Sequence, residues 1–192
     1  MSVTQPQLIL DFWFDVPEGH EHGRTRSFWF RQSDQTDALI RQRFGVAVEE
    51  ALRGQFDRWS ATPRGTLALI LLLDQFTRNI FRGQPRAFAG DARALHWAAA
   101  LTDAGEDRGL SLHERWFAYL PFEHAESLPL QQRSVELYTV LAADGLAEPL
   151  SWAIRHRDVI ERFGRFPHRN NIVGRESSAE EVAFLSEPGS RF

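Results

Sequence analysis

The chain has 192 residues, of which 43% are hydrophobic, and it contains 6 Trp and 15 Phe. This is enough apolar material for one folded domain with a sizeable core, and it argues against a disordered chain. The formal net charge is −4, so there is no overall positive field to attract nucleic acid or an anionic membrane. Cysteine is absent, which excludes disulfides, thiolate metal ligands and a cysteine nucleophile.

The N-terminus and the longest apolar run bear on localisation. The first residues, MSVTQPQLILDFWF, lack the basic region and small-residue cleavage site of a secretory signal. The longest apolar run, Leu67 to Leu73, is far shorter than the roughly 18 residues that span a bilayer. We therefore expect a cytoplasmic protein that does not cross a membrane.

The N-terminal third predicts two helices. Thr4 and Pro6 suit the start of the first, which Pro17 ends, and Ser33 suits the start of a second that runs to about Arg53. The predicted inward-facing residues of the second helix are Leu39, Ile40, Phe44, Ala47, Val48, Ala51 and Leu52. Between the helices, His20 and His22 stand beside two acids. This pattern fits weak binding of a divalent metal, but it is more typical of a solvated loop.

The central and C-terminal parts predict further helices with clear punctuation. Thr62-Pro63 begins a central helix that Gly83 and Pro85 end. The remaining helices are expected over 87–104, from the capping box at Ser111 to Pro121, from Pro129 to Gly145, over 150–163, and from the capping box at Ser178 and Glu181. Over 150–163, the residues predicted to face inward are Trp152, His156, Ile160 and Phe163.

No segment alternates apolar and polar residues between turn signals, so no strand is expected. The predicted class is all-α, with seven to eight helices packed as antiparallel pairs. We expect a single domain over residues 1–192, in which residues 176–192 form a short helix and a tail.

The first candidate segment for chemistry lies on the central helix. Its polar residues follow the apolar run at positions i, i+1, i+4, i+5 and i+8, which places them in one stripe about 140° wide at 100° per residue. They are Asp74, Gln75, Arg78, Asn79 and Arg82. Asp74 and Arg78 have the spacing of a helical ion pair. The stripe is either a solvated face, or a polar cleft or buried network. The short, directional amides of Gln75 and Asn79 favour a cleft or a network over a solvated face.

The second candidate segment is Glu123, His124 and Glu126, predicted to lie in an extended or turn segment after Pro121. A histidine with two nearby carboxylates can act as a general base with an orienting acid, or can supply metal ligands. A histidine held by a carboxylate for structural reasons is the alternative.

The third candidate segment is a turn set by Gly164 and Pro167. It presents four consecutive polar side chains, which are His168, Arg169, Asn170 and Asn171. Guanidinium and amide groups suit an anionic or amide-bearing ligand. They also suit the capping of carbonyls left free at a helix end. His156, on the preceding helix, is typical of a core histidine.

These three segments carry a resemblance to a known family. DQFTRNIFRG, WFAYLPFEHAE and FGRFPHRNNIVGR, together with the opening LDFWF and the closing EEVAFL, resemble the bacterial family known as domain of unknown function 924. The resemblance covers essentially the whole chain and implies a tetratricopeptide-like right-handed superhelix of helix pairs. It implies no activity. Ala125 stands where members often carry Ser, which speaks against a hydroxyl nucleophile beside His124.

Three functional hypotheses follow. The first is a binding module in which the stripe lines a concave face with His124, Glu126 and the His168–Asn170 turn, and holds a small anionic or peptide-like ligand. In this hypothesis Arg78, Arg82 and Arg169 pair with the anionic group. The second is a hydrolase that uses His124 with a carboxylate or a bound metal. The third is a structural scaffold with a buried polar network. Nucleic acid is not expected as a partner because the chain is acidic and its arginines are scattered.

Overall fold

The computed structural model describes residues 5–14 and 25–190. Within these residues the chain forms helices and no strand, which confirms the all-α prediction. The helices are α1 (Pro6–Phe14), α2 (Asp34–Leu52), α3 (Pro63–Ile70), α4 (Thr77–Ile80), α5 (Asp91–Asp103), α6 (Leu112–Glu123), α7 (Leu128–Ala143), α8 (Glu148–Phe163), α9 (Asn170–Val173) and α10 (Ala179–Leu185). A π-helical turn, Leu71–Phe76, joins α3 and α4 into one continuous helix. The ten labelled segments therefore make nine helices in the described part of the chain, slightly more than predicted.

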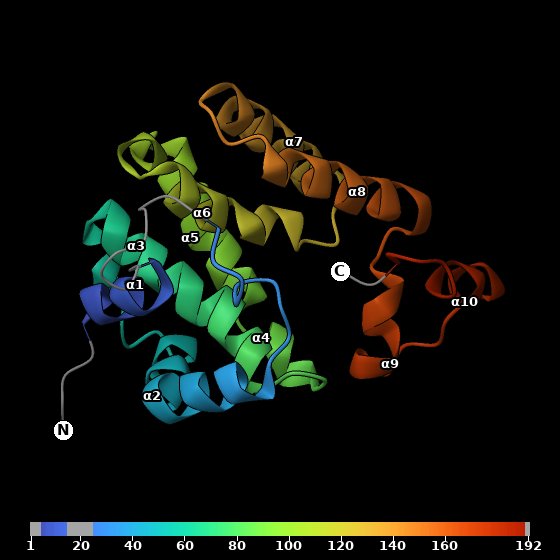
Figure 1. Cartoon of the computed structure of the whole chain (residues 1–192), viewed down its shortest axis with the longest axis horizontal. Coiled ribbons are helices and arrows are strands. Elements are labelled where there is room, and N and C mark those ends of the chain that lie inside the picture. Colours follow the sequence, from blue (N-terminus) through green and yellow to red (C-terminus); the bar gives the residue numbers. More distant parts are fainter. Residues whose placement is uncertain (1–4, 15–24, 191–192) are drawn as a thin grey trace.

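The continuous helix from α3 to α4 lies at the centre of the main core (Figure 1). Every residue from Leu67 to Leu73 has an exposed fraction of 0%, and α1, α2, α5 and α6 all contact this helix. Its start is as predicted: the Thr62 hydroxyl accepts a hydrogen bond from the Gly65 amide, and Pro63 is the first helical residue. The predicted central helix is confirmed, and its apolar run is fully buried.

Local capping chemistry also places three other predicted helix starts correctly. Ser33 caps α2, and Ser111 and Ser178 each form a complete capping box, at α6 and α10 respectively. The helix predicted over 87–104 begins later, at Asp91, after a short 3-10 turn over Pro85–Phe88. Two residues predicted to face inward, Leu39 and Trp152, are each 42% exposed. The predictions for Thr4, Pro17, His20 and His22 lie outside the described residues.

The prediction that Pro121 ends its helix is wrong. Helix α6 continues to Glu123, and His124 is its C-terminal capping residue. The continuation is stabilised because Phe122 is buried in the main core. In addition, the Gln131 side-chain amide donates to the backbone carbonyls of Glu123 and Ala125, at 2.6 and 2.8 Å. These bonds satisfy carbonyl groups that a helix end otherwise leaves free.

The C-terminal part packs partly on itself. Helices α7 and α8 lie side by side (Figure 1), and α8 ends at Gly164, whose φ of +69° suits glycine. A small second core follows around Phe166, which is 0% exposed and packs with Val159 and Ile160 of α8.

In the described residues we find no helix that combines the length and the apolar character needed to cross a membrane. The tetratricopeptide-like superhelix stays a prediction.

Candidate functional site

The three segments singled out in the sequence meet in space. Asp74 lies in the π-helical turn, His124 at the end of α6, and Arg169 in a 3-10 turn, Pro167–Arg169, before α9. His124 Nδ1 is 2.7 Å from Asp74 Oδ1, and Arg78 Nη1 is 3.1 Å from the same oxygen. Asp91 connects the third segment to the first. Its carboxylate accepts two hydrogen bonds from Arg78, at 2.8 and 3.0 Å, and lies 3.7 Å from Arg169.

A glycine brings Asp91 to this cluster. Asp91 is the first residue of α5 and follows Gly90. A Cβ atom on Gly90 would lie 2.1 Å from the Leu73 carbonyl oxygen, closer than any real Cβ contact. Only glycine therefore lets α5 begin directly against the π-helical turn. The acid at the start of α5 then lies within reach of Arg78, one turn further along the central helix.

Asp74 is the most enclosed charged group of the cluster, with an exposed fraction of 0%. Burial alone would raise its pKa, but the charge of Arg78 and the hydrogen bonds from His124 and Gln75 lower the pKa below its ordinary value. Its second oxygen accepts a hydrogen bond from the Gln75 amide at 2.6 Å. Asp74 is thus an ionised acceptor, and only a proton on His124 Nδ1 can complete the 2.7 Å hydrogen bond.

His124 is correspondingly a neutral imidazole. Burial and the charge of Arg78 lower its pKa, against the opposing effect of Asp74. With the proton on Nδ1, the lone pair lies on Nε2. No residue in the described part of the chain hydrogen-bonds to Nε2, and the side chain keeps 16% of its surface exposed.

Glu123, the residue before His124, has the opposite electrostatic environment from Asp74. Burial and the nearby charge of Asp74 raise its pKa to about 8, so it is protonated at neutral pH. Its Oε1 is 3.2 Å from His156 Nδ1, and its Oε2 is buried with no partner among the described residues. His156 donates from Nδ1 to the Trp152 carbonyl at 2.9 Å, and burial lowers its pKa to about 3. It is a neutral core histidine, as its pattern indicated.

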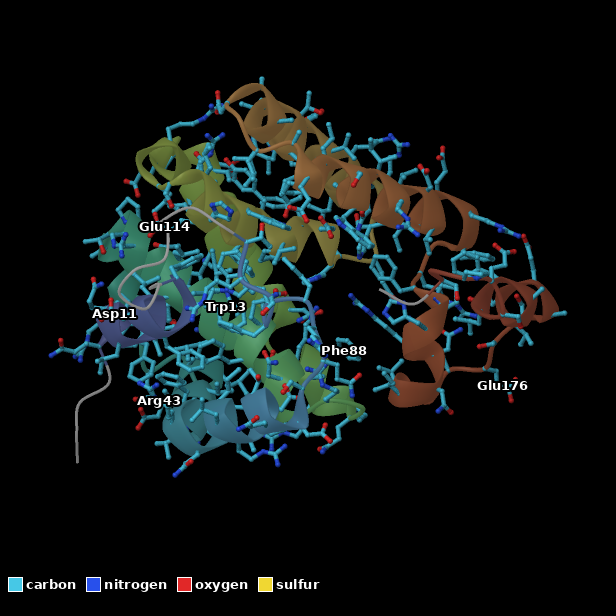
Figure 2. The ribbon with its side chains drawn as sticks, viewed as in Figure 1. Asp11, Trp13, Arg43, Phe88, Glu114 and Glu176 are labelled. Carbon is cyan, nitrogen blue, oxygen red and sulfur yellow. The ribbon has the colours of Figure 1, made fainter. Side chains whose placement is uncertain are left out.

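Arg169 is the least satisfied cation of the cluster. Its exposed fraction is 8%, and its guanidinium lies between two aromatic rings, 4.8 Å from the centroid of Phe88 and 4.5 Å from that of Phe166. Phe88 is labelled in Figure 2, where the green central helix faces the red C-terminal segment. Burial and the charge of Arg78 lower the pKa of Arg169 to about 10. Among the described residues, its buried Nε has no hydrogen-bond partner, and no side chain accepts a hydrogen bond from the guanidinium.

The stripe on the central helix is divided between two partners. Asp74, Gln75 and Arg78 belong to the cluster around His124. Asn79 and Arg82 contact Asp37 of α2 instead: Asn79 donates at 2.7 Å and Arg82 donates twice, at 2.6 and 3.0 Å. The π-helical turn departs from the 3.6-residue repeat on which the stripe was drawn.

The remaining candidates connect the cluster to the C-terminal segment. Glu126 pairs with Arg175 through two hydrogen bonds of 2.6 and 2.8 Å, and accepts the Phe166 backbone amide at 2.9 Å. Asn170, 0% exposed, donates to the Ser177 hydroxyl at 3.1 Å, while its buried Oδ1 has no partner within residues 5–14 and 25–190. Burial and the charge of Arg169 lower the pKa of His168 to about 4.

Several contributors to this cluster were not predicted from the sequence, namely Asp91, Phe88, Phe166 and Gly90. Asp91 carries a weak signal, since an acid at the first position of a helix is common, but the sequence does not indicate which cation it faces.

Among the described residues, no three His, Cys, Asp or Glu side chains gather in a way that could hold a metal ion. A surface hollow of about 210 Å³ between α5 and α7 is lined by Asp107, Arg133 and their neighbours, and by none of the residues of the three segments.

Comparison with known proteins places the chain in a family. A solved structure of a protein of unknown function from Agrobacterium tumefaciens is 39% identical, with a TM-score of 0.84 over 94% of this chain and 96% of that chain. No protein with a curated description matches. The family model described as "Bacterial protein of unknown function (DUF924)" matches residues 9–189. The chain therefore belongs to this family.

Proposed function

We propose that the protein is a binding module for a small anionic or peptide-like ligand, held at the cluster of Arg169, Arg78 and His124. The observation that carries this proposal is the state of Arg169. The residue is 8% exposed and its guanidinium lies between two phenylalanine rings. The guanidinium is 3.7 Å from the Asp91 carboxylate, and its buried Nε has no hydrogen-bond partner among the described residues. A buried charge whose donors are not all satisfied is costly, and an anionic ligand would reduce this cost.

The geometry favours a carboxylate or a phosphate as the anionic group. A planar guanidinium with free donors binds such oxygens through paired hydrogen bonds. Arg78 already donates to Asp91 and to the Asp74 carbonyl, so it contributes a fixed positive charge rather than a new hydrogen bond.

The proposal includes two statements about the fold. The site would lie on the concave face of a tetratricopeptide-like superhelix, and residues 1–192 would fold as one domain. The second statement is supported by the composition of the site, because Asp74 and His124 come from elements of the main core, whereas Phe166 belongs to the small C-terminal core.

A thermal-shift and calorimetric screen of acetate, succinate, inorganic phosphate and short peptides with a free carboxylate tests the proposal. A ligand present at 100 times its Kd stabilises the native state by about 2.7 kcal/mol, which raises Tm by about 5–10 °C in a chain of this size. The shift should disappear in Arg169→Ala and persist in Arg155→Ala, an exposed arginine on α8. A screen with no hit, or hits that survive Arg169→Ala, would refute the proposal.

The scaffold hypothesis has its own supporting observation. Arg78 connects Asp74 of the central helix to Asp91 of α5, and Asp74 also holds His124 of α6. These contacts join three helices through one buried carboxylate. A stabilising role for Asp74 and Arg78 is compatible with ligand binding at Arg169.

A further inference from the structure

We infer that the Asp74–His124 pair makes this site catalytic, with His124 activating a water molecule that cleaves an ester or amide bond of a small anionic acyl compound. The inference rests on the proposed binding site, because Arg169 would hold the anionic group of the substrate. It goes beyond binding because it assigns a reaction to His124.

The positioning of His124 is the first supporting observation. Asp74 is fully buried and fixed on both oxygens, by Gln75 at 2.6 Å and by Arg78 at 3.1 Å. Its Oδ1 accepts the Nδ1–H of His124 at 2.7 Å. A carboxylate that holds Nδ1–H fixes both the orientation of the ring and the tautomer with a basic Nε2.

The state of Nε2 is the second observation. It has no hydrogen-bond partner among the described residues, and the side chain is 16% exposed. The core histidine His156 is more deeply enclosed, with 7% of its side chain exposed. The basic nitrogen of His124 is therefore available to a water molecule or a ligand, a few ångströms from a buried and ionised aspartate.

The nucleophile is assigned to water because the described part of the chain offers no better candidate beside His124. Cysteine is absent, the residue after His124 is Ala125, and no described hydroxyl group hydrogen-bonds to the imidazole. A water molecule on Nε2 would be activated by general base catalysis.

The reaction balances without a redox partner. Nε2 takes a proton from water while the water oxygen forms a bond to the acyl carbon, giving a tetrahedral oxyanion. The bond to the leaving alcohol or amine then breaks, and the leaving group takes the proton back from Nε2. The products are a carboxylic acid and an alcohol or amine. Asp74 is a positioning residue here, since its carboxylate stabilises the transient imidazolium, while the positive charges of Arg78 and Arg169 favour the oxyanion.

The test uses the full-length protein with two chromogenic esters, the anionic 4-nitrophenyl hemisuccinate and the neutral 4-nitrophenyl acetate. We expect the wild type to cleave the anionic ester with the higher kcat/KM, and His124→Gln to lower that kcat/KM by about 100-fold or more, as loss of a general base does. Loss of activity towards low pH should set in below the ordinary pKa of histidine, 6.5, because the pKa of His124 is lowered. His96→Gln, which alters an exposed histidine on α5, should leave all rates unchanged.

The outcomes separate this inference from the proposed binding function. If phosphate or succinate binds to the wild type and not to Arg169→Ala, yet neither ester is cleaved, the catalytic inference is wrong and the binding site stands. If cleavage depends on His124 but not on Arg169, the catalytic pair stands and the anion site is wrong. The inference is overturned directly if the His124→Gln variant still cleaves the ester at the wild-type rate. Far-ultraviolet circular dichroism that matches the wild type would show that this variant is folded.

Discussion

Glu123→Gln should change how the stability of the protein depends on pH. The pKa of Glu123 is raised from 4.5 to about 8 in the folded protein, chiefly by burial and then by the charge of Asp74. Between these two values the folded state keeps the proton and the unfolded state loses it, so stability falls as pH rises. One pKa unit corresponds to about 1.4 kcal/mol. Relative to pH 4, ionisation of Glu123 in the unfolded state therefore lowers the free energy of unfolding of the wild type by about 3 kcal/mol at pH 7 and by about 5 kcal/mol at pH 9.

Glutamine resembles the protonated acid in shape and cannot ionise. The variant should therefore be close to the wild type in stability at pH 4, and more stable than the wild type at pH 9. The introduced amide would occupy the position of the Glu123 carboxyl group, whose Oε1 lies 3.2 Å from His156 Nδ1 in the wild type.

Urea unfolding of the wild type and the variant at pH 4, 5, 7 and 9 measures the difference in the free energy of unfolding. Glu136→Gln is the matched control, because Glu136 has a side chain that is 66% exposed, and its difference from the wild type should stay near zero throughout. A difference between the wild type and Glu123→Gln that does not change with pH would show that Glu123 ionises normally in the folded protein.

Two further changes test the packing of the cluster. Asp74→Ala should lower the free energy of unfolding by about 3–5 kcal/mol, because it leaves Arg78 and His124 without a buried partner; near-wild-type urea unfolding would contradict the buried network. Gly90→Ala should cost at least about 1–3 kcal/mol, since its Cβ would lie 2.1 Å from the Leu73 carbonyl oxygen and force α5 outwards; differential scanning calorimetry that shows an unchanged Tm would contradict this close approach.

The helical class and most helix starts were predictable because they depend on local chemistry. A Ser or Thr hydroxyl that caps the next turn leaves a signature within four residues, as at Ser111 and Ser178. The end of α6 was not predictable from Pro121. It depends on Gln131, eight residues beyond Glu123, whose amide donates to the carbonyls at the helix end.

The candidate site was predictable in composition but not in arrangement. The sequence indicated Asp74, Arg78, His124 and Arg169 as chemically notable, and these four belong to one connected cluster. It could not indicate that Asp91 connects the two arginines, because that contact requires α5 to approach the π-helical turn at Gly90. The ionisation states also depend on tertiary burial, which gives Asp74 and Glu123 opposite pKa shifts.

The π-helical turn over Leu71–Phe76 has a consequence for how this sequence can change. Such a turn holds about one residue more than an α-helical turn, so losing a single residue there would convert it into an α-helical turn and leave the helical segments on either side in their orientation. Arg82 would keep its place opposite Asp37, whereas the side chains inside the turn, Asp74 among them, would point in new directions. Relatives that keep the contact between Asp74 and His124 should therefore keep the length of this segment.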